Sequence, residues 1–155
     1  MRLGSAFAVI TLFAAAAVAQ LSVGQSSPPQ SKPAQIAAGK YIVENVAMCS
    51  TCHTQRLSSG EFIAKRHLMG GRLVFKVPAA GRWADEAPQI AGLPRWEDQE
   101  IVILLTTGKL ETGLSMRPPM PQFRMSKQDA EAVVAYLRSL ASPKRSARAR
   151  EAFTH

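Results

Sequence analysis

Two cysteines and a histidine form a short cluster whose spacing points to one kind of chemistry. Cys49 and Cys52 are separated by two residues, and His53 follows directly. Two thiols one helical turn apart can add across the two vinyl groups of one porphyrin, and the adjacent histidine then lies beneath the iron. The spacing therefore predicts one haem c, bound covalently through Cys49 and Cys52, with His53 as the proximal iron ligand.

Other uses of a pair of cysteines with this spacing fit the chain less well. A thioredoxin-like redox pair requires a preceding strand and a βαβ unit, and the sequence pattern shows neither. A four-cysteine zinc site or an iron–sulfur cluster needs more thiolates than the two cysteines in the chain. A structural disulfide is compatible with an exported protein, but it gives no reason for a histidine directly after the second cysteine.

The N-terminus has the pattern of an export signal. A short basic start is followed by an apolar run from Leu3 to Ala19, which ends in the small-x-small sequence Ala17-Val18-Ala19. We expect residues 1–19 to be a signal peptide and the mature protein to be periplasmic, where bacterial haem c is attached. An uncleaved membrane anchor is the alternative, although the run is near the lower length limit for a bilayer-spanning helix.

Composition divides the rest of the chain into three parts. Residues 20–33 are polar and rich in proline, which predicts a linker that does not pack. Residues 34–141 carry the apolar periodicity of one folded domain of common size. Residues 142–155 form a basic tail, since Pro143 ends the last helical pattern and few large apolar residues follow.

Three segments have the spacing of amphipathic helices. Residues 34–48 predict a first helix that carries the cysteines at its C-terminal end. Residues 96–107 have acidic side chains in the first turn, where the helix dipole favours them, and end before a glycine. In residues 126–140, Ser126 and Asp129 resemble a capping box, and apolar residues then recur three and four apart.

The segment between the first two helices, residues 54–95, contains many glycines and prolines and no sustained period. So long a loop is unusual in a compact domain. A flat, apolar haem would give its large apolar side chains a packing partner. The residues expected to pack on the haem are Leu68, Leu73, Val74, Phe75, Trp83, Ile90 and Leu93.

Met120 is the predicted sixth ligand of the iron. It lies in Arg117-Pro118-Pro119-Met120-Pro121, where the prolines restrict the φ angles and predict a stiff, extended segment. A methionine opposite a histidine raises the reduction potential, which suits a carrier late in an oxidative chain. Met116 and Met125 are nearby alternatives, and His67 would instead give bis-histidine ligation.

These motifs together resemble those of class I c-type cytochromes. The similarity is carried by residues 39–53, by the segments Met69-Gly70-Gly71-Arg72 and Ala87-Pro88, by residues 117–123 and by the helix ending at Leu140. The resemblance is greatest to the cytochrome modules of periplasmic dehydrogenases such as membrane-bound alcohol dehydrogenases, which often carry three modules where this chain carries one.

The resemblance implies an all-α cytochrome c fold, with three to five short helices around one covalently bound haem and long irregular loops. It also implies that the first and last helices cross at Gly39, near Tyr136 and Leu137.

With both axial positions of the iron filled, the domain cannot readily activate a substrate, and the chain lacks a flavin, nicotinamide or zinc signature. We therefore expect a one-electron carrier in a respiratory or dehydrogenase-linked chain, and not an enzyme. Two alternatives stay open. The chain would be a permanent cytochrome subunit of a dehydrogenase complex if it stayed bound to one partner. It would be a haem sensor or peroxidase-like protein if the methionine ligand were absent.

The charge of the chain bears on its partners. The chain has 19 basic and 11 acidic residues, for a net charge of +8. Without Arg2 and the tail from Ser142, which holds four basic residues and one acidic residue, the net charge is +4. A moderately positive protein is steered toward redox partners with an acidic docking face, including a membrane-bound dehydrogenase or oxidase. Export to the periplasm argues against nucleic acid as a partner.

Overall fold

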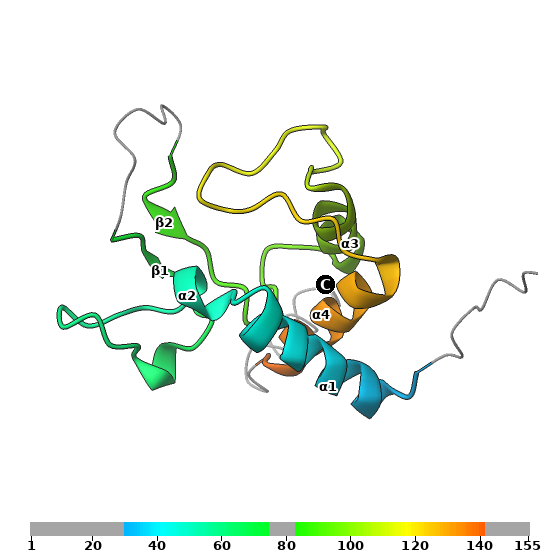
Figure 1. Ribbon diagram of the computed structural model, residues 1–155, viewed down its shortest axis with the longest axis horizontal. Coiled ribbons are helices and arrows are strands. Elements are labelled where there is room, and N and C mark those ends of the chain that lie inside the picture. Colours follow the sequence, from blue (N-terminus) through cyan, green and yellow to red (C-terminus); the bar gives the residue numbers. More distant parts are fainter. Residues whose placement is uncertain (1–29, 75–82, 142–155) are drawn as a thin grey trace, which may run out of the picture.

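The computed structural model describes residues 30–74 and 83–141, and the fold is mainly helical in these ranges (Figure 1). The four α-helices are α1 (Lys32–Tyr41), α2 (Ser50–His53), α3 (Asp98–Thr107) and α4 (Lys127–Ser139). The predicted all-α class is confirmed. The expected signal peptide and basic tail lie outside the described residues. Within the described ranges, no helix is long and apolar enough to span a bilayer.

A two-stranded antiparallel sheet, which the sequence did not predict, joins two parts of the long loop. Strand β1 (Gly71–Arg72) pairs with β2 (Glu86–Ala87), so that Gly71 is opposite Ala87. Each strand has only two residues, too few for an alternating apolar pattern to be visible in the sequence. The pairing sets the position of the residues that follow β2.

The first helix begins earlier and ends differently from the prediction. Helix α1 starts at Lys32, two residues before the expected boundary, because Pro33 is accommodated in the first turn, where no intrahelical N–H bond is needed. The helix continues into a π-helical turn, Ile42–Val46, and then stops. Met48 adopts a positive φ of 47°, so the helix ends two residues earlier than predicted, and Cys49 and Cys52 follow its C-terminal end on a separate short helix.

The other two helices begin and end close to the predicted residues. Helix α3 starts at Asp98, since Glu97 is its N-cap and its backbone N–H donates to Glu100 Oε2 at 2.9 Å. Gly108 ends it in the left-handed conformation, which favours glycine. At the start of α4, the Ser126 hydroxyl accepts a hydrogen bond from the Asp129 backbone N–H at 3.1 Å, as the sequence predicted.

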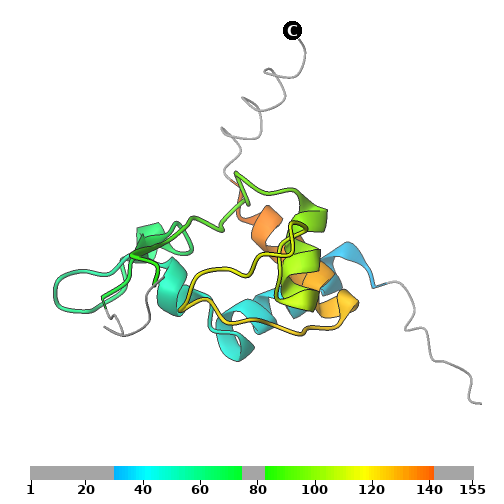
Figure 2. The ribbon, with the colours of Figure 1, turned by 90° about the horizontal axis from the view of Figure 1, so that it is seen from above.

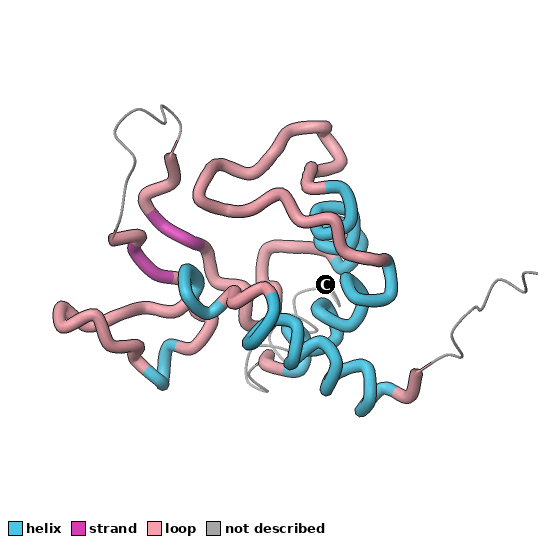
Figure 3. Tube along the Cα trace, in the orientation of Figure 1, coloured by secondary structure: helices cyan, strands magenta, loops and turns pink. Residues whose placement is uncertain are grey.

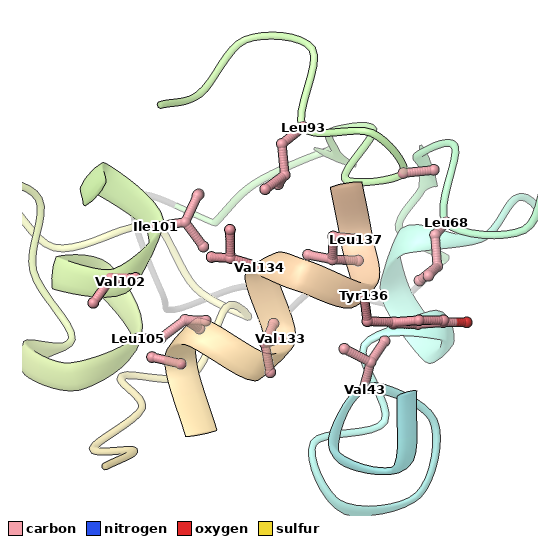
Figure 4. Packing of buried hydrophobic residues seen from close by; sticks show 12 residues of the cluster. Val43, Leu68, Leu93, Ile101, Val102, Leu105, Val133, Val134, Tyr136 and Leu137 are labelled. Atoms are coloured by element: carbon pink, nitrogen blue, oxygen red, sulfur yellow. The ribbon is translucent and has the colours of Figure 1, made fainter. Parts of the chain in front are cut away.

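Helices α1 and α4 cross closely at Gly39, which confirms the expectation drawn from the family resemblance. A Cβ atom at Gly39 would overlap the carbonyl oxygen of Ala132 and lie 2.9 Å from Cβ of Tyr136. Helix α3 packs on α4 as well, so α4 is the centre of the helical part. Figure 4 shows the core around it, with Ile101, Val102 and Leu105 of α3 facing α4 at one end and Val43 and Leu68 beside Tyr136 at the other.

Long loops connect the helices (Figure 3), and part of the first loop belongs to the polypeptide core. Leu68 is 0% and Leu93 1% exposed, so a haem could cover no further surface on them. The backbone N–H groups of Ile90 and Ala91 both donate to Leu68 O at 2.9 Å, which holds the two segments together. The prediction that Leu68 and Leu93 pack on the haem was therefore wrong. Phe75 lies outside the described residues.

Arg138 of α4 is the main polar link between this helix and the segment that precedes α3. Its guanidinium donates to the carbonyl oxygens of Gly92 and Leu93, each at 3.0 Å, and of Trp96 at 2.6 Å. Nε also donates to Asp98 Oδ1 at 2.6 Å. One planar group thus satisfies three loop carbonyls and a carboxylate, which a lysine cannot do.

We expect Arg138→Met to lower the free energy of unfolding by about 2–3 kcal/mol, because the aliphatic stem stays while three carbonyls lose their donor. This expected change allows for solvent, which weakens the interactions of Arg138 because 35% of its side chain is exposed. Urea unfolding of the haem-loaded protein measures the change. As a control, Lys127→Ala removes an exposed pair with Glu131 at 3.7 Å and should change stability by less than about 0.5 kcal/mol. Equal effects of the two variants would contradict the proposed role of Arg138.

Candidate functional site

The two cysteines lie at the start of a separate short helix. Cys49 is the N-cap of α2, and its backbone N–H donates to Val43 O of the π turn at 2.9 Å. The His53 N–H donates to Cys49 O at 2.9 Å, so the two thiols and the imidazole share one helical turn. Both cysteines are partly exposed and neither forms a disulfide. A structural disulfide therefore has no support here.

Both thiols are uncharged at neutral pH. Burial raises the pKa of the Cys49 thiol to about 11, and the negative charge of Glu44 acts in the same direction. Burial also raises the pKa of the Cys52 thiol, against an opposing effect of Arg56. Within the described part of the chain, no group of three or more His, Cys, Asp and Glu side chains could hold a metal ion, so a zinc site has no support either.

His53 is held in one tautomer by a residue far away in the sequence. The imidazole is 7% exposed, and its Nδ1 lies 2.7 Å from the carbonyl oxygen of Pro88. A carbonyl oxygen only accepts, so Nδ1 carries the proton and donates it. Burial lowers the pKa of His53, with the bond to Pro88 partly opposing, and the ring is neutral. Nε2 is thus left with its lone pair for a metal ion.

The short sheet explains why Pro88 reaches His53. Pro88 directly follows β2, and β1 on the other side is joined to the motif because the Gly70 N–H donates to His53 O at 2.7 Å. Thr54 is 4% exposed, and its hydroxyl accepts from the Leu68 N–H at 3.0 Å. A side chain at Gly70 would meet Ala87 O at 2.8 Å, so the close approach requires glycine.

Sequence reasoning missed the role of Pro88. The pair Ala87-Pro88 was noted only as part of the family resemblance. No local sequence pattern shows which carbonyl a distant histidine will contact. The geometry of these residues fits haem c: two unpaired thiols on one turn, a neutral imidazole oriented by its Nδ1, and Nε2 free to bind iron.

Met120 lies in the loop between α3 and α4, and this loop turns back toward the side of the molecule that carries α2 and β2 (Figures 1 and 2). The Ala84 N–H donates to Pro118 O at 2.7 Å, which ties the loop to the segment before β2. The Met120 N–H donates to Arg117 O at 3.3 Å. The expected extended segment is therefore a turn. Pro118 and Pro119 lack an N–H, and Met120 is the first residue that can close it.

The alternative ligands have other contacts. Met125 packs against the hydrophobic core, and its backbone N–H donates to Leu105 O at 3.0 Å. His67 Nε2 lies 2.8 Å from Glu44 Oε1, so this imidazole is already engaged by a carboxylate. Met116 is half-buried, like Met120, so burial does not distinguish which of the two methionines is the iron ligand.

The fold and this site define a small helical protein that carries covalently bound haem. The sequence profile of the cytochrome c family matches residues 36–141, and the chain belongs to the cytochrome c family. One haem c is bound through Cys49 and Cys52.

Two relatives with stated functions are similar to most of the chain. The cytochrome subunit of a fructose dehydrogenase from Gluconobacter japonicus is 29% identical over 127 residues, which cover 76% of this chain and 24% of the relative. One of the subunits of a nicotinate dehydrogenase from Pseudomonas putida is 29% identical over 130 residues, covering 77% of this chain and 10% of the relative. The chain thus spans a quarter or less of the length of these proteins.

Proposed function

We propose that this chain is a periplasmic one-electron carrier whose single haem is ligated by His53 and Met120. The observation that carries the proposal is the orientation of His53, whose Nδ1–H is donated to Pro88 O at 2.7 Å directly beside the two attachment cysteines. This contact leaves Nε2 as the nitrogen that would bind iron. Membership of the cytochrome c family supports electron transfer as the activity.

When bound, the haem supplies reversible uptake of a single electron at iron. The polypeptide supplies the rest. Cys49 and Cys52 hold the cofactor against α2, and the bond from His53 to Pro88 prevents rotation of the imidazole. Met120 would supply a neutral sulfur to the iron and would exclude water and small ligands. Since neither His53 nor Met120 would change charge, little would have to reorganise when an electron arrives or leaves.

We propose a dehydrogenase as the electron donor. Both relatives described above are subunits of dehydrogenases, which supports this class of partner. A net charge of +4 without Arg2 and the basic tail favours a partner with an acidic docking face. The relatives hold the similar region within much longer chains, which supports a second candidate, a permanently bound cytochrome subunit. Copurification of the chain with a dehydrogenase at high salt would favour that second candidate over a freely diffusing carrier.

The test of the ligand assignment is Met120→Ala, made in a host with haem c maturation. We expect wild type to show a sulfur-to-iron charge-transfer band when oxidised, and the variant to lose it and bind carbon monoxide when reduced. The potential should fall by about 0.1 V or more, because axial ligands set haem potentials over ~0.8 V. Met116→Ala is the matched control and should keep the band. A wild-type protein that lacks the band and binds carbon monoxide would instead indicate a sensor or peroxidase-like protein.

A further inference from the structure

A polar cluster outside the haem ligands joins three elements of the fold. Glu44 of the π turn accepts two hydrogen bonds at the same atom, Oε1. One comes from His67 Nε2 at 2.8 Å and the other from the Tyr136 hydroxyl of α4 at 2.9 Å. Tyr136 lies at the α1–α4 crossing (Figure 4), and His67 directly follows the 3-10 turn Ala64–Arg66. The function proposed above uses none of these three side chains.

The hydrogen bonds determine where protons reside in this cluster. An ionised carboxylate only accepts, so Nε2 of His67 carries a proton, and Nδ1 is the atom at which a second proton can add. The imidazole side chain is 41% exposed, which gives solvent protons access. Burial and the bond to Glu44 raise the pKa of Tyr136 to about 12, so its hydroxyl stays a donor at neutral pH. Histidine is the side chain that ordinarily changes charge between pH 5 and 8.

The cluster is electrostatically connected to the haem attachment. Glu44 precedes Cys49 by five residues, and the intervening chain is folded back so that the Cys49 N–H donates to Val43 O at 2.9 Å. The Glu44 charge also contributes to the raised pKa of the Cys49 thiol, so its field reaches the sulfur that joins the porphyrin. A charge change at His67, 2.8 Å from this carboxylate, is therefore added to a field that already acts at Cys49, one of the two residues that attach the haem.

We propose that His67 is the redox-linked proton-binding residue of this cytochrome, and that Glu44 is the residue that positions it. This inference rests on the proposed electron-transfer function. When a reduced partner protein delivers one electron, the proton occupancy of His67 Nδ1 rises by a fraction of a proton, which comes from solvent; on oxidation the electron leaves and the same fraction of a proton returns to solvent. The N–H bond at Nδ1 is the one bond made and broken. Lys65 and Arg66 are the basic side chains of the turn that directly precedes His67.

The expected size of the change in proton affinity follows from the Coulomb interaction between His67 and the redox-active haem through partly solvated protein. An imidazolium in contact with Glu44, whose neighbour Val43 is hydrogen-bonded to the haem-attaching Cys49, should bind its proton about threefold more tightly in the reduced protein. Since a tenfold change corresponds to ~59 mV for one electron, the potential should fall by about 28 mV as pH rises through the histidine titration. The sign is negative with rising pH, because the positive charge that stabilises the reduced form is lost.

The experiment is a spectroelectrochemical titration of the full haem-loaded protein from pH 5 to 8.5. His67→Gln keeps an amide donor for Glu44 but cannot titrate, and it should remove most of the fall in potential. Tyr136→Phe is the matched control, because it removes the other donor to Glu44 and should leave the fall in place. Glu44→Gln removes a negative charge and should raise the potential throughout the range.

A second measurement uses the wild-type protein alone and so does not depend on whether the variants fold. NMR titration of wild type should show that His67 binds its proton about threefold more tightly in the reduced protein than in the oxidised protein.

An unchanged pH dependence in a folded His67→Gln would overturn the proposal and assign the effect to another group, such as the haem propionates. A His67 titration that is the same in both oxidation states would also overturn it. Neither result affects the proposed function, which is tested separately by the sulfur-to-iron band. If that band is absent from wild type, the ligand assignment fails whatever the pH dependence.

Discussion

Gly39→Ala should lower the free energy of unfolding by about 3 kcal/mol or more. Alanine favours a helix over glycine by ~1 kcal/mol, so the helical propensity alone predicts the opposite sign. The added methyl group, however, would overlap the Ala132 carbonyl oxygen and lie 2.9 Å from Cβ of Tyr136, and these are atoms of another helix that cannot rotate away. Relief requires α1 and α4 to separate, which costs more than the propensity gains.

Urea unfolding of the haem-loaded protein, followed by circular dichroism, measures this effect. The matched control is Ala37→Val, which enlarges a side chain on the exposed side of the same helix and should cost less than about 1 kcal/mol. A Gly39→Ala protein as stable as wild type would show that the two helices do not approach as closely as described.

The second large effect concerns the covalent bonds to haem. We expect the double variant Cys49→Ala, Cys52→Ala to retain no covalently bound haem, because the chain has no other cysteine that could form a thioether. Each single variant should retain one thioether and one free vinyl group, with reduced yield. Mass spectrometry of the denatured chain distinguishes zero, one and two bonds when combined with the haem absorption spectrum, which shifts to longer wavelength for each unreacted vinyl group.

Ser50→Ala and Thr51→Ala are the controls, since these residues lie between the cysteines in α2 and leave the thiols and His53 in place. Both should retain full covalent haem. Haem that stays attached to the denatured double variant would contradict attachment through Cys49 and Cys52.

The local patterns predicted much of this fold. The positions of α3 and α4 followed from side chains within a few residues of each helix end, such as Ser126 at one N-terminus and Gly108 at one C-terminus. Caps and amphipathic faces depend on neighbours in the sequence, so they are visible without a structure. The π turn that ends α1 and the left-handed Met48 that follows it carry no such local signal, and the boundary there was misplaced.

The sequence by itself determined that the chain carries one haem, because the spacing of Cys49, Cys52 and His53 matches the attachment pattern of haem c and occurs once. Tertiary structure decided how that site is held. The partner of His53 is the Pro88 carbonyl, 35 residues away, and the Glu44 carboxylate meets Tyr136 across 92 residues. Every residue has a backbone carbonyl, so the sequence alone does not show which one His53 contacts. The β1–β2 pairing selects Pro88, and the α1–α4 crossing brings Tyr136 to Glu44. Both are three-dimensional contacts that leave no periodic pattern in the sequence.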